Sequence, residues 1–173
     1  MRWPIVLLAV LAGIPIAVVG VGLVLPKEHT ATSHATIKAP PDSVWAALTD
    51  VNEFPAWRDD VARVEVLPSR DGHRLWREIG KHDAVTFEEA EADPPRRLVA
   101  RIADPSLPFG GSWTYVVAPD VGGSRVTITE DGVIYNPVFR FVARFVFGHH
   151  ATQQEFLRAL GRRFGHDATP VRG

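Results

Sequence analysis

The chain has 173 residues, with 19 basic and 20 acidic side chains and a formal net charge of −1. Without a basic excess there is no indication of nucleic-acid binding, and the absence of cysteine excludes disulfides, thiolate metal ligands and a thiol nucleophile. The length suits one domain with an appendage.

The N-terminal stretch at 3–25 carries no charged or strongly polar side chain. As a helix it would be about 35 Å long, enough to cross a hydrocarbon core of about 30 Å. A cleaved signal peptide is the alternative, but its apolar region is usually about 7–15 residues long and ends at a small-x-small site, which is missing here. A buried core helix is disfavoured because glycine and proline, present at Gly13, Pro15 and Gly20, are commoner in membrane helices.

Three parts are therefore expected: a transmembrane anchor at 1–26, a domain at 27–166 and a flexible tail at 167–173. Arg2 and the α-amino group flank the N-terminal end of the apolar stretch, and Lys27 flanks the other end. Because basic flanks favour the cytoplasmic side, we expect a single-pass membrane protein whose domain lies outside the cytoplasm.

The first elements after the anchor are predicted to be a strand and two short helices. The pattern at 32–39 predicts a strand of moderate quality, and Pro40 ends it. Asp42 can cap the first helix. A turn and the second helix are expected at 50–57.

Alternating apolar and polar residues then predict about six consecutive strands, separated by turn signals such as Asp71-Gly72. Consecutive strands with short turns indicate an antiparallel sheet, so the domain is predicted to be α+β rather than α/β. The expected strands cover residues 61–67, 73–80, 85–92, 97–103, 112–118 and 125–135.

One long helix is expected after the strands, at 137–164. Asn136 can cap it, and Pro137 suits the first helical position. At 1.5 Å per residue this helix would be roughly 40 Å long. Its apolar face recurs at three- and four-residue steps and includes Phe145 and His149. Such a helix needs a large apolar surface, which a curved sheet can supply.

Five packing and turn motifs of the chain resemble those of one superfamily. They are IKAPPDSVWAALTD at 37–50, FPAWR at 54–58, PPRRL at 94–98, GGSWTY at 110–115 and TITEDG at 127–132. The superfamily is SRPBCC, also called START-like or polyketide cyclase/dehydrase-like, and the similarity covers about residues 31–164. None of these motifs is catalytic, so they are evidence for a fold and not for a reaction.

The resemblance implies the helix-grip fold, in which a curved antiparallel sheet wraps around a long C-terminal helix. It also implies a cavity between sheet and helix, commonly used for lipids, sterols, polyketides and other apolar molecules. The N-terminal anchor is an addition about which the similarity says nothing.

Aromatic side chains are the main candidates for the wall of such a cavity. An amphipathic aromatic wall suits a flat, apolar ligand with few polar contacts. The alternative is that these rings simply fill the core. The predicted ligand-binding residues are Trp57, Trp76, Phe87, Trp113, Tyr115, Glu130, Phe145 and His149.

Glu130, Glu78 and His149 are weak catalytic candidates. Glu130 continues an alternating apolar pattern, so it points inward if that side of the strand is concave. A carboxylic acid in an apolar pocket can act as a general acid or base. The alternative is that Glu130 pairs with Arg77 or Arg101 on a solvent-facing ladder.

The remaining motifs are uninformative about cofactors. The seven histidines show no metal-site spacing on one helix face, and there is no phosphate loop, nucleophile elbow or dinucleotide fingerprint. We therefore expect no metal and no cofactor. Arg140 and Arg144 among phenylalanines suggest either a solvated face or contact with anionic lipid headgroups.

These observations predict a membrane-anchored module that binds or transfers a small hydrophobic ligand in an internal cavity. The second hypothesis is a cyclase- or dehydratase-like enzyme that uses a cavity carboxylate or histidine. The third is an interaction domain without a ligand, its cavity filled by aromatic side chains.

Overall fold

The computed structural model describes residues 3–173, with the side chains of residues 4–12 and 147 outside the description. Arg2, on which the predicted orientation depends, lies outside this range. The helices are α1 (Trp3–Val24), α2 (Pro41–Thr49), the 3-10 turn η1 (Val51–Glu53), α3 (Phe54–Trp57), α4 (Pro137–Val142), the π-helical turn η2 (Ala143–Phe147) and α5 (Ala151–Arg163). The strands are β1 (Glu28–Ile37), β2 (Arg63–Arg70), β3 (His73–Ile79), β4 (Ala84–Asp93), β5 (Arg97–Ile102), β6 (Phe109–Asp120), β7 (Gly123–Ile134) and β8 (Val171–Arg172).

All the strands form one antiparallel sheet in the order β2-β3-β4-β5-β6-β7-β1-β8. The meander from β2 to β7 continues to β1, which pairs with β7 from Glu28↔Val133 to Ile37↔Ser124. This arrangement confirms the predicted α+β class and its antiparallel sheet. The six strands of the meander lie where the alternating pattern predicted them.

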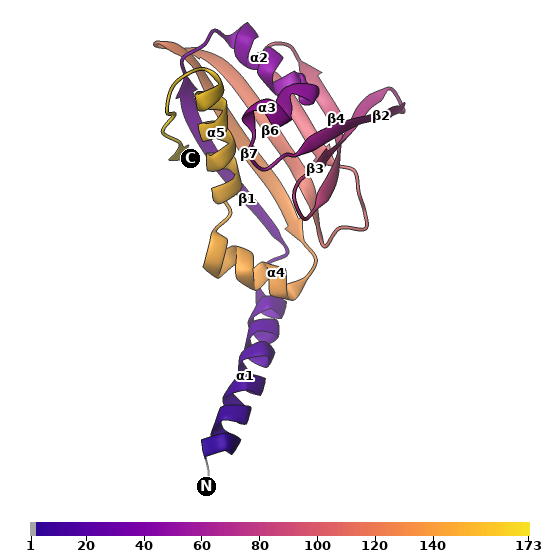
Figure 1. Ribbon diagram of the computed structural model, residues 1–173, viewed down its shortest axis with the longest axis vertical. Helices are drawn as coiled ribbons and strands as arrows, with labels where there is room; N and C mark the ends of the chain where they lie inside the picture. The colour runs from indigo at the N-terminus through magenta and orange to yellow at the C-terminus, as the bar shows by residue number, and fades with distance from the viewer. Residues whose placement is uncertain (1–2) are drawn as a thin grey trace.

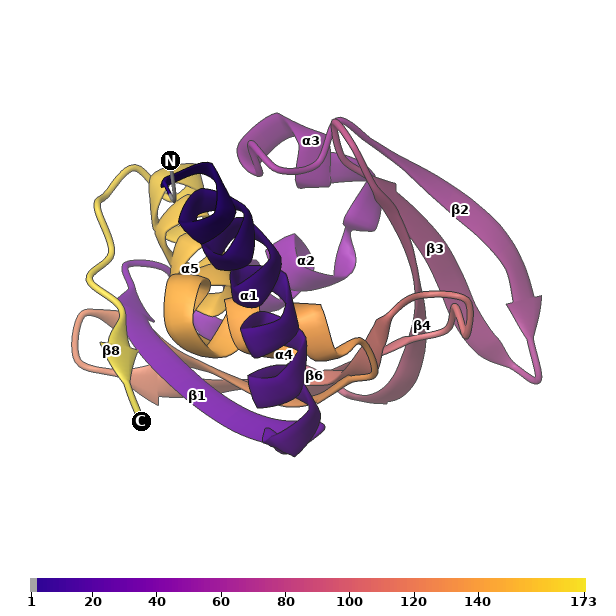
Figure 2. The same ribbon diagram turned by 90° about the horizontal axis from the view of Figure 1, so that it is seen from below.

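The sheet is curved, and α2, α3 and α5 lie on its concave side (Figures 1 and 2). Side chains from the two layers form the core, because every second residue of a strand points to the same face. Ile37, Val126 and Ile128 from the sheet and Leu157 and Leu160 from α5 are fully buried there.

The single long helix predicted for 137–164 is interrupted. Asn136 does cap its start, since Oδ1 accepts from the backbone N–H groups of Val138 and Phe139 at 2.9 and 3.2 Å. Gly148 then breaks the run with φ 74°, a left-handed conformation that glycine adopts without strain. The chain changes direction there, so α5, the part that lies on the sheet, has only 13 residues.

The predicted membrane anchor is wrong. Among the residues that the structure describes, no helix is both long and apolar enough to cross a membrane. The predicted localisation, a single-pass membrane protein with its domain outside the cytoplasm, is therefore wrong as well. α1 projects from the domain beside α4 (Figure 1), and Arg140 of α4 donates from Nη1 to the Leu25 carbonyl oxygen at 2.9 Å.

Both ends of the predicted domain carry more structure than expected. β1 begins at Glu28, before the strand that was predicted at 32–39. The tail at 167–173, expected to be flexible, contains β8, which pairs with β1 at Ser33↔Arg172 and His34↔Val171. Ala168 in the same tail is buried in the core.

Candidate functional site

The concave face carries both aromatic and polar side chains, brought together by strand register. Trp113 of β6 lies opposite Glu130 of β7, and Tyr115 lies opposite Ile128. On the other side of β7, Glu130 lies opposite Ala31 of β1. Because cross-strand partners share a face, Trp113, Tyr115 and Glu130 all point toward α5.

Aromatic rings fill the space between the middle of the sheet and α5. Phe156 of α5 is at their centre, with its centroid 5.4 Å from those of Trp57 and Tyr115 and 6.1 Å from that of Trp113. Trp57, Tyr115 and Phe156 are buried, and Trp113 is half-buried beside them. Three of the predicted ligand-binding residues therefore pack in the core around one ring of α5.

Trp76 and Phe87 form a second aromatic pair, on neighbouring strands. They are register partners of β3 and β4, and their rings stack with centroids 5.7 Å apart. Phe145 is the exception among the predicted wall residues. It lies in η2, packs against Phe141 with a centroid distance of 4.9 Å, and is 59% exposed.

Glu130, His29 and His149 form a polar group at one end of the concave face, here called the Glu130 cluster. His29 donates from Nε2 to Glu130 Oε1 at 3.2 Å, and the rings of His29 and His149 stack with centroids 4.0 Å apart. The side chains of His29 and Glu130 retain 14% and 22% exposure. The Glu130 carboxylate thus pairs with a histidine, and not with Arg77 or Arg101.

A glycine makes room for this cluster. Gly132 lies opposite His29 in the register of β7 and β1. A Cβ atom on Gly132 would lie 2.3 Å from Cε1 and 2.6 Å from Nε2 of the His29 ring. The missing side chain therefore allows the imidazole to lie flat across β7 and reach Glu130.

The charge state of His149 follows from its surroundings. Burial lowers the pKa of His149, and the neighbouring His29 lowers it further, while Glu130 acts in the opposite direction. An imidazole with a lowered pKa is neutral near pH 7, so a ring nitrogen of His149 can accept a proton.

The start of α5 holds His149 in place. His150 Nδ1 and Ser33 Oγ form a hydrogen bond at 3.3 Å. One turn into the helix, the fully buried Gln153 donates from Nε2 to the Ala31 carbonyl oxygen at 2.9 Å. These two contacts tie the start of α5 to β1 next to the cluster.

Glu78 belongs to a separate polar group on the same face. Its Oε2 forms an ion pair with Arg58 Nη1 at 2.9 Å, and Trp76 donates from Nε1 to its Oε1 at 2.9 Å. The side chains of Arg58 and Glu78 are only 11% and 12% exposed. Burial raises the pKa of Glu78, and the attraction of Arg58 opposes this shift.

The charges of both polar groups act on the phenol of Tyr115. Burial raises the pKa of Tyr115 well above its usual range, and the carboxylates of Glu78 and Glu130 raise it further, while Arg58 acts against them. The hydroxyl therefore stays protonated at any physiological pH and is a permanent hydrogen-bond donor.

The remaining sequence expectations fall outside the site. Arg140 is buried and bonds backbone carbonyl groups, so it is not free to contact a headgroup, whereas Arg144 is exposed. Within residues 3–173 no group of three or more His, Asp or Glu side chains is arranged to hold a metal ion.

Two residues of these polar groups were missed by sequence reasoning. His29 precedes the strand predicted at 32–39, and only the pairing of β1 with β7 brings it to Glu130. Arg58 follows the FPAW turn, and its partner Glu78 is 20 positions away on another element. Neither contact has a local signature, although an early histidine before a predicted strand could have been extended into that strand.

Comparison with known proteins shows which family this chain matches. The family described as "Polyketide cyclase / dehydrase and lipid transport" matches residues 28–165. A curated relative, the granaticin polyketide synthase bifunctional cyclase/dehydratase of Streptomyces violaceoruber, is 27% identical over 124 residues, which are 64% of this chain and 38% of the relative. The chain thus spans well under half the length of that relative.

Solved structures show the same fold at low identity. The Zhui aromatase/cyclase from Streptomyces sp. R1128 superposes with a TM-score of 0.64 at 17% identity, covering 79% of this chain and 93% of the other. The di-domain ARO/CYC StfQ from the steffimycin biosynthetic pathway gives a TM-score of 0.63 at 14% identity, covering 79% of this chain and 50% of the other.

The family match and the structural matches confirm the resemblance to the SRPBCC superfamily. The match at 28–165 runs from the first residue of β1 to beyond the end of α5, so it includes the concave face with all of its aromatic and polar groups. The chain belongs to the polyketide cyclase/dehydrase and lipid transport family.

Proposed function

We propose that the chain binds a polyketide-like ligand, an oxygen-rich molecule with an apolar body, at the concave face and transfers protons on it in a cyclase- or dehydratase-type reaction. The observation that carries this proposal is the Glu130 cluster, in which a carboxylate and two imidazoles meet at hydrogen-bonding and stacking distance. Family membership and the name of the curated relative agree with this class of chemistry.

The chemistry needs a base and a proton donor close together. In a ring closure, His149 removes a proton from a carbon next to a carbonyl group, and the resulting enolate carbon bonds to a second carbonyl carbon. The protonated His149 then returns its proton to the new alkoxide oxygen. In a dehydration, His149 removes the neighbouring C–H proton, and its imidazolium then gives this proton to the hydroxyl group, which leaves as water while the C=C bond forms.

The neighbouring residues support each step. The Glu130 carboxylate, hydrogen-bonded to His29, places negative charge beside the imidazolium that forms. The Tyr115 phenol, protonated at any physiological pH, can donate a hydrogen bond to the substrate carbonyl oxygen while negative charge develops on it. Trp113 lies opposite Glu130 and offers an apolar surface beside the reacting atoms.

A second candidate function is binding or transfer of an apolar ligand without chemistry. The family description, which includes lipid transport, favours it, and the half-buried Trp113 gives an apolar ligand a surface to contact beside Glu130. In this case Glu130 and His149 would orient a ligand and not react with it.

Proton exchange on a simple ketone separates the two functions. The probe is 2-tetralone, a two-ring aromatic ketone, whose exchange of α-protons for deuterium is followed by ¹H NMR in D₂O. We expect the chain to accelerate exchange and the variant His149→Gln to lose about 100-fold of this acceleration, the lower end of the range for a general base. Glu130→Gln should reduce it as well.

The matched control is His34→Gln. His34 lies on β1 as His29 does, but it faces the opposite side of the sheet because its position has the other parity. This variant should exchange 2-tetralone as the unchanged chain does. Binding without acceleration, seen as quenching of tryptophan fluorescence, would support the binding module instead. Neither binding nor acceleration would support the interaction domain.

A further inference from the structure

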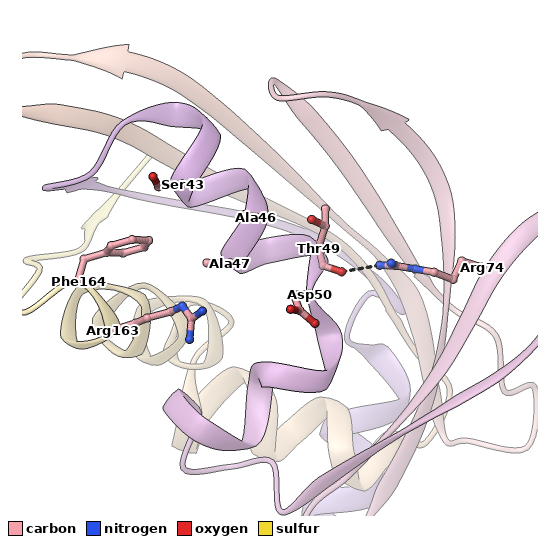
Figure 3. A pocket seen from close by; sticks show the side chains of 8 residues that line it. All are labelled: Ser43, Ala46, Ala47, Thr49, Asp50, Arg74, Arg163 and Phe164. Carbon is pink, nitrogen blue, oxygen red and sulfur yellow. Dashed lines mark hydrogen bonds between the residues drawn. The ribbon is translucent and has the colours of Figure 1, made fainter.

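A second polar site lies away from the Glu130 cluster, in a pocket between α2, the end of α5 and β3 (Figure 3). Its volume of about 450 Å³ is within the range of small-molecule pockets. The lining residues are Ser43, Ala46, Ala47, Thr49, Asp50, Arg74, Arg163 and Phe164. The mixture of two cations, one carboxylate and an aromatic ring makes this a candidate binding site.

Arg163 is the cation available to a ligand. It is exposed at the end of α5, and within the described residues it has no carboxylate within 4.0 Å. The neighbouring Arg162, in contrast, is paired with Asp59 at 3.3 Å and with Glu155 at 3.2 Å. The Arg163 guanidinium lies 5.9 Å from the centroid of Trp57, which holds it over the pocket without neutralising it.

Arg74 provides a second, anchored cation. Its Nη2 donates to the Thr49 carbonyl oxygen at 2.8 Å and lies 3.3 Å from Glu89 Oε2. Its Nε is buried and has no hydrogen-bond partner among the described residues. A guanidinium has five N–H donors, so Arg74 is fixed in position while some of its donors stay unused.

Asp50 adds an acceptor to the same pocket. Figure 3 shows Arg163 extending from α5 into the pocket, on the side where Asp50 lies, and Arg74 reaching from β3 to Thr49. Within the described residues, however, neither arginine forms an ion pair with Asp50, since no cation lies within 4.0 Å of its carboxylate. Phe164, Ala46 and Ala47 supply the apolar part of the lining.

We propose that this pocket binds a small organic anion that also carries a hydroxyl group on an aromatic or similarly flat body. Arg163 contacts the anionic group, because guanidinium groups match carboxylates in geometry and charge, while Arg74, whose charge is offset by Glu89, lines the pocket beside it. Asp50 accepts the hydrogen bond of the hydroxyl, and Phe164 contacts the flat body. The C-terminal ends of α2 and α5 add partial negative charge, so Arg163 is essential for attraction of the anion.

This site is separate from the proposed proton-transfer site, and the two can be tested independently. The probe is salicylate, which has a carboxylate, a hydroxyl group and one ring, and salicylamide is its neutral counterpart. Binding to the full chain is measured by equilibrium dialysis at low ionic strength. We expect salicylate to bind more tightly than salicylamide and to weaken as salt is added.

Matched variants locate the binding. Arg163→Gln should weaken salicylate binding roughly fivefold, the upper end for a solvent-exposed charge contact, whereas Arg162→Gln should leave it unchanged. Ala46→Trp should prevent binding by filling the pocket, because Ala46 is exposed on α2 and lines the pocket. All three variants should exchange 2-tetralone as the unchanged chain does, so failure of one proposal does not imply failure of the other.

Two results would overturn the proposal. One is equal binding of salicylate and salicylamide, which would show that the anion is not recognised. The other is an equal loss on Arg162→Gln and Arg163→Gln, which would show that only overall charge matters. Normal thermal unfolding of Arg163→Gln establishes that a loss of binding is local.

Discussion

Two carboxylates face the same side of the sheet, yet Glu78 and Glu130 have different surroundings. Glu78 forms an ion pair with Arg58 and accepts a hydrogen bond from the Trp76 indole, both at 2.9 Å. Glu130 has one hydrogen bond, from His29 at 3.2 Å, and its side chain is nearly twice as exposed. The two groups were indistinguishable as catalytic candidates in the sequence.

These surroundings suit Glu78 to a structural role and Glu130 to a chemical one. Arg58 also contacts Asp60 at 2.6 Å and lies over the rings of Phe54 and Phe156 at 5.1 and 5.2 Å. Every charge in that group has a partner, so a proton transfer there would leave a buried charge unpaired. The Glu130 cluster keeps free lone pairs and some access to solvent, which a general acid or base requires.

The largest expected effect comes from breaking the Arg58–Glu78 pair. Arg58→Met leaves the buried Glu78 carboxylate without its cation, and we expect a loss of about 3 kcal/mol in the free energy of unfolding. The measurement is urea unfolding at pH 7. The double variant Arg58→Met/Glu78→Gln removes both charges, while the new side-chain amide can still accept a hydrogen bond from Trp76, so it should recover part of the loss.

A contradiction would be simple to recognise. If Arg58→Met unfolds at the same urea concentration as the unchanged chain but loses 2-tetralone exchange, the pair acts in chemistry. Glu130→Gln provides the comparison, since the more exposed cluster should lose activity with little change in stability.

A smaller effect is expected from Gly132→Ala, which addresses the Glu130 cluster alone. The new methyl group would overlap the His29 ring, so the imidazole must move away from Glu130. We expect a stability loss of about 1 kcal/mol, at the low end for overpacking, because the ring can swing toward solvent. The rate of 2-tetralone exchange should fall more than this stability loss explains.

Gly110→Ala is the matched control on the adjacent strand. The three atoms nearest to a Cβ atom there all belong to the Tyr135 side chain, with the hydroxyl group nearest at 3.2 Å, and Tyr135 is exposed and can move. Its exchange rate should match that of the unchanged chain. Equal loss in both variants would mean that sheet distortion, and not displacement of His29, lowers the rate.

The sheet and its concave face could be predicted because strand alternation is a local property. The pattern at Val126, Ile128 and Glu130 placed all three side chains on one face, and the structure places them so. The position of His149 near the sheet was also predicted, although from a continuous helix that Gly148 interrupts.

The features that could not be predicted from the sequence are those fixed by tertiary contacts. β8 has only two residues and no pattern, so only its pairing with β1 defines it. The contact of His29 with Glu130 spans 101 positions and depends on register rather than on any local signal. The predicted membrane anchor is wrong for another reason: an apolar stretch does not by itself establish a membrane span, and no helix among the described residues is long and apolar enough for one.

The smallest expected effect is in the pH dependence of the exchange reaction, and it distinguishes His149 from the carboxylates. The pKa of His149 is lowered from 6.5, chiefly by burial. A base with a lowered pKa stays neutral to more acidic pH, so the rate of 2-tetralone exchange should be constant above pH 6.5 and fall only below it. The same shift predicts that the stability contribution of His149 is present above pH 6.5 and is lost as pH falls through its lowered pKa.

Measurements below pH 6.5 test the predicted rate and the predicted stability together. The rate of the unchanged chain is measured as a function of pH in D₂O buffers, and urea midpoints are measured at the same values. His149→Gln should have no inflection below pH 6.5 in the residual rate and a flatter dependence of stability on pH. Glu78, whose pKa is raised, acts in the opposite sense, since its contribution to stability is lost as pH rises. An inflection that persists in His149→Gln and disappears in Glu78→Gln would therefore reverse the roles assigned to the two groups.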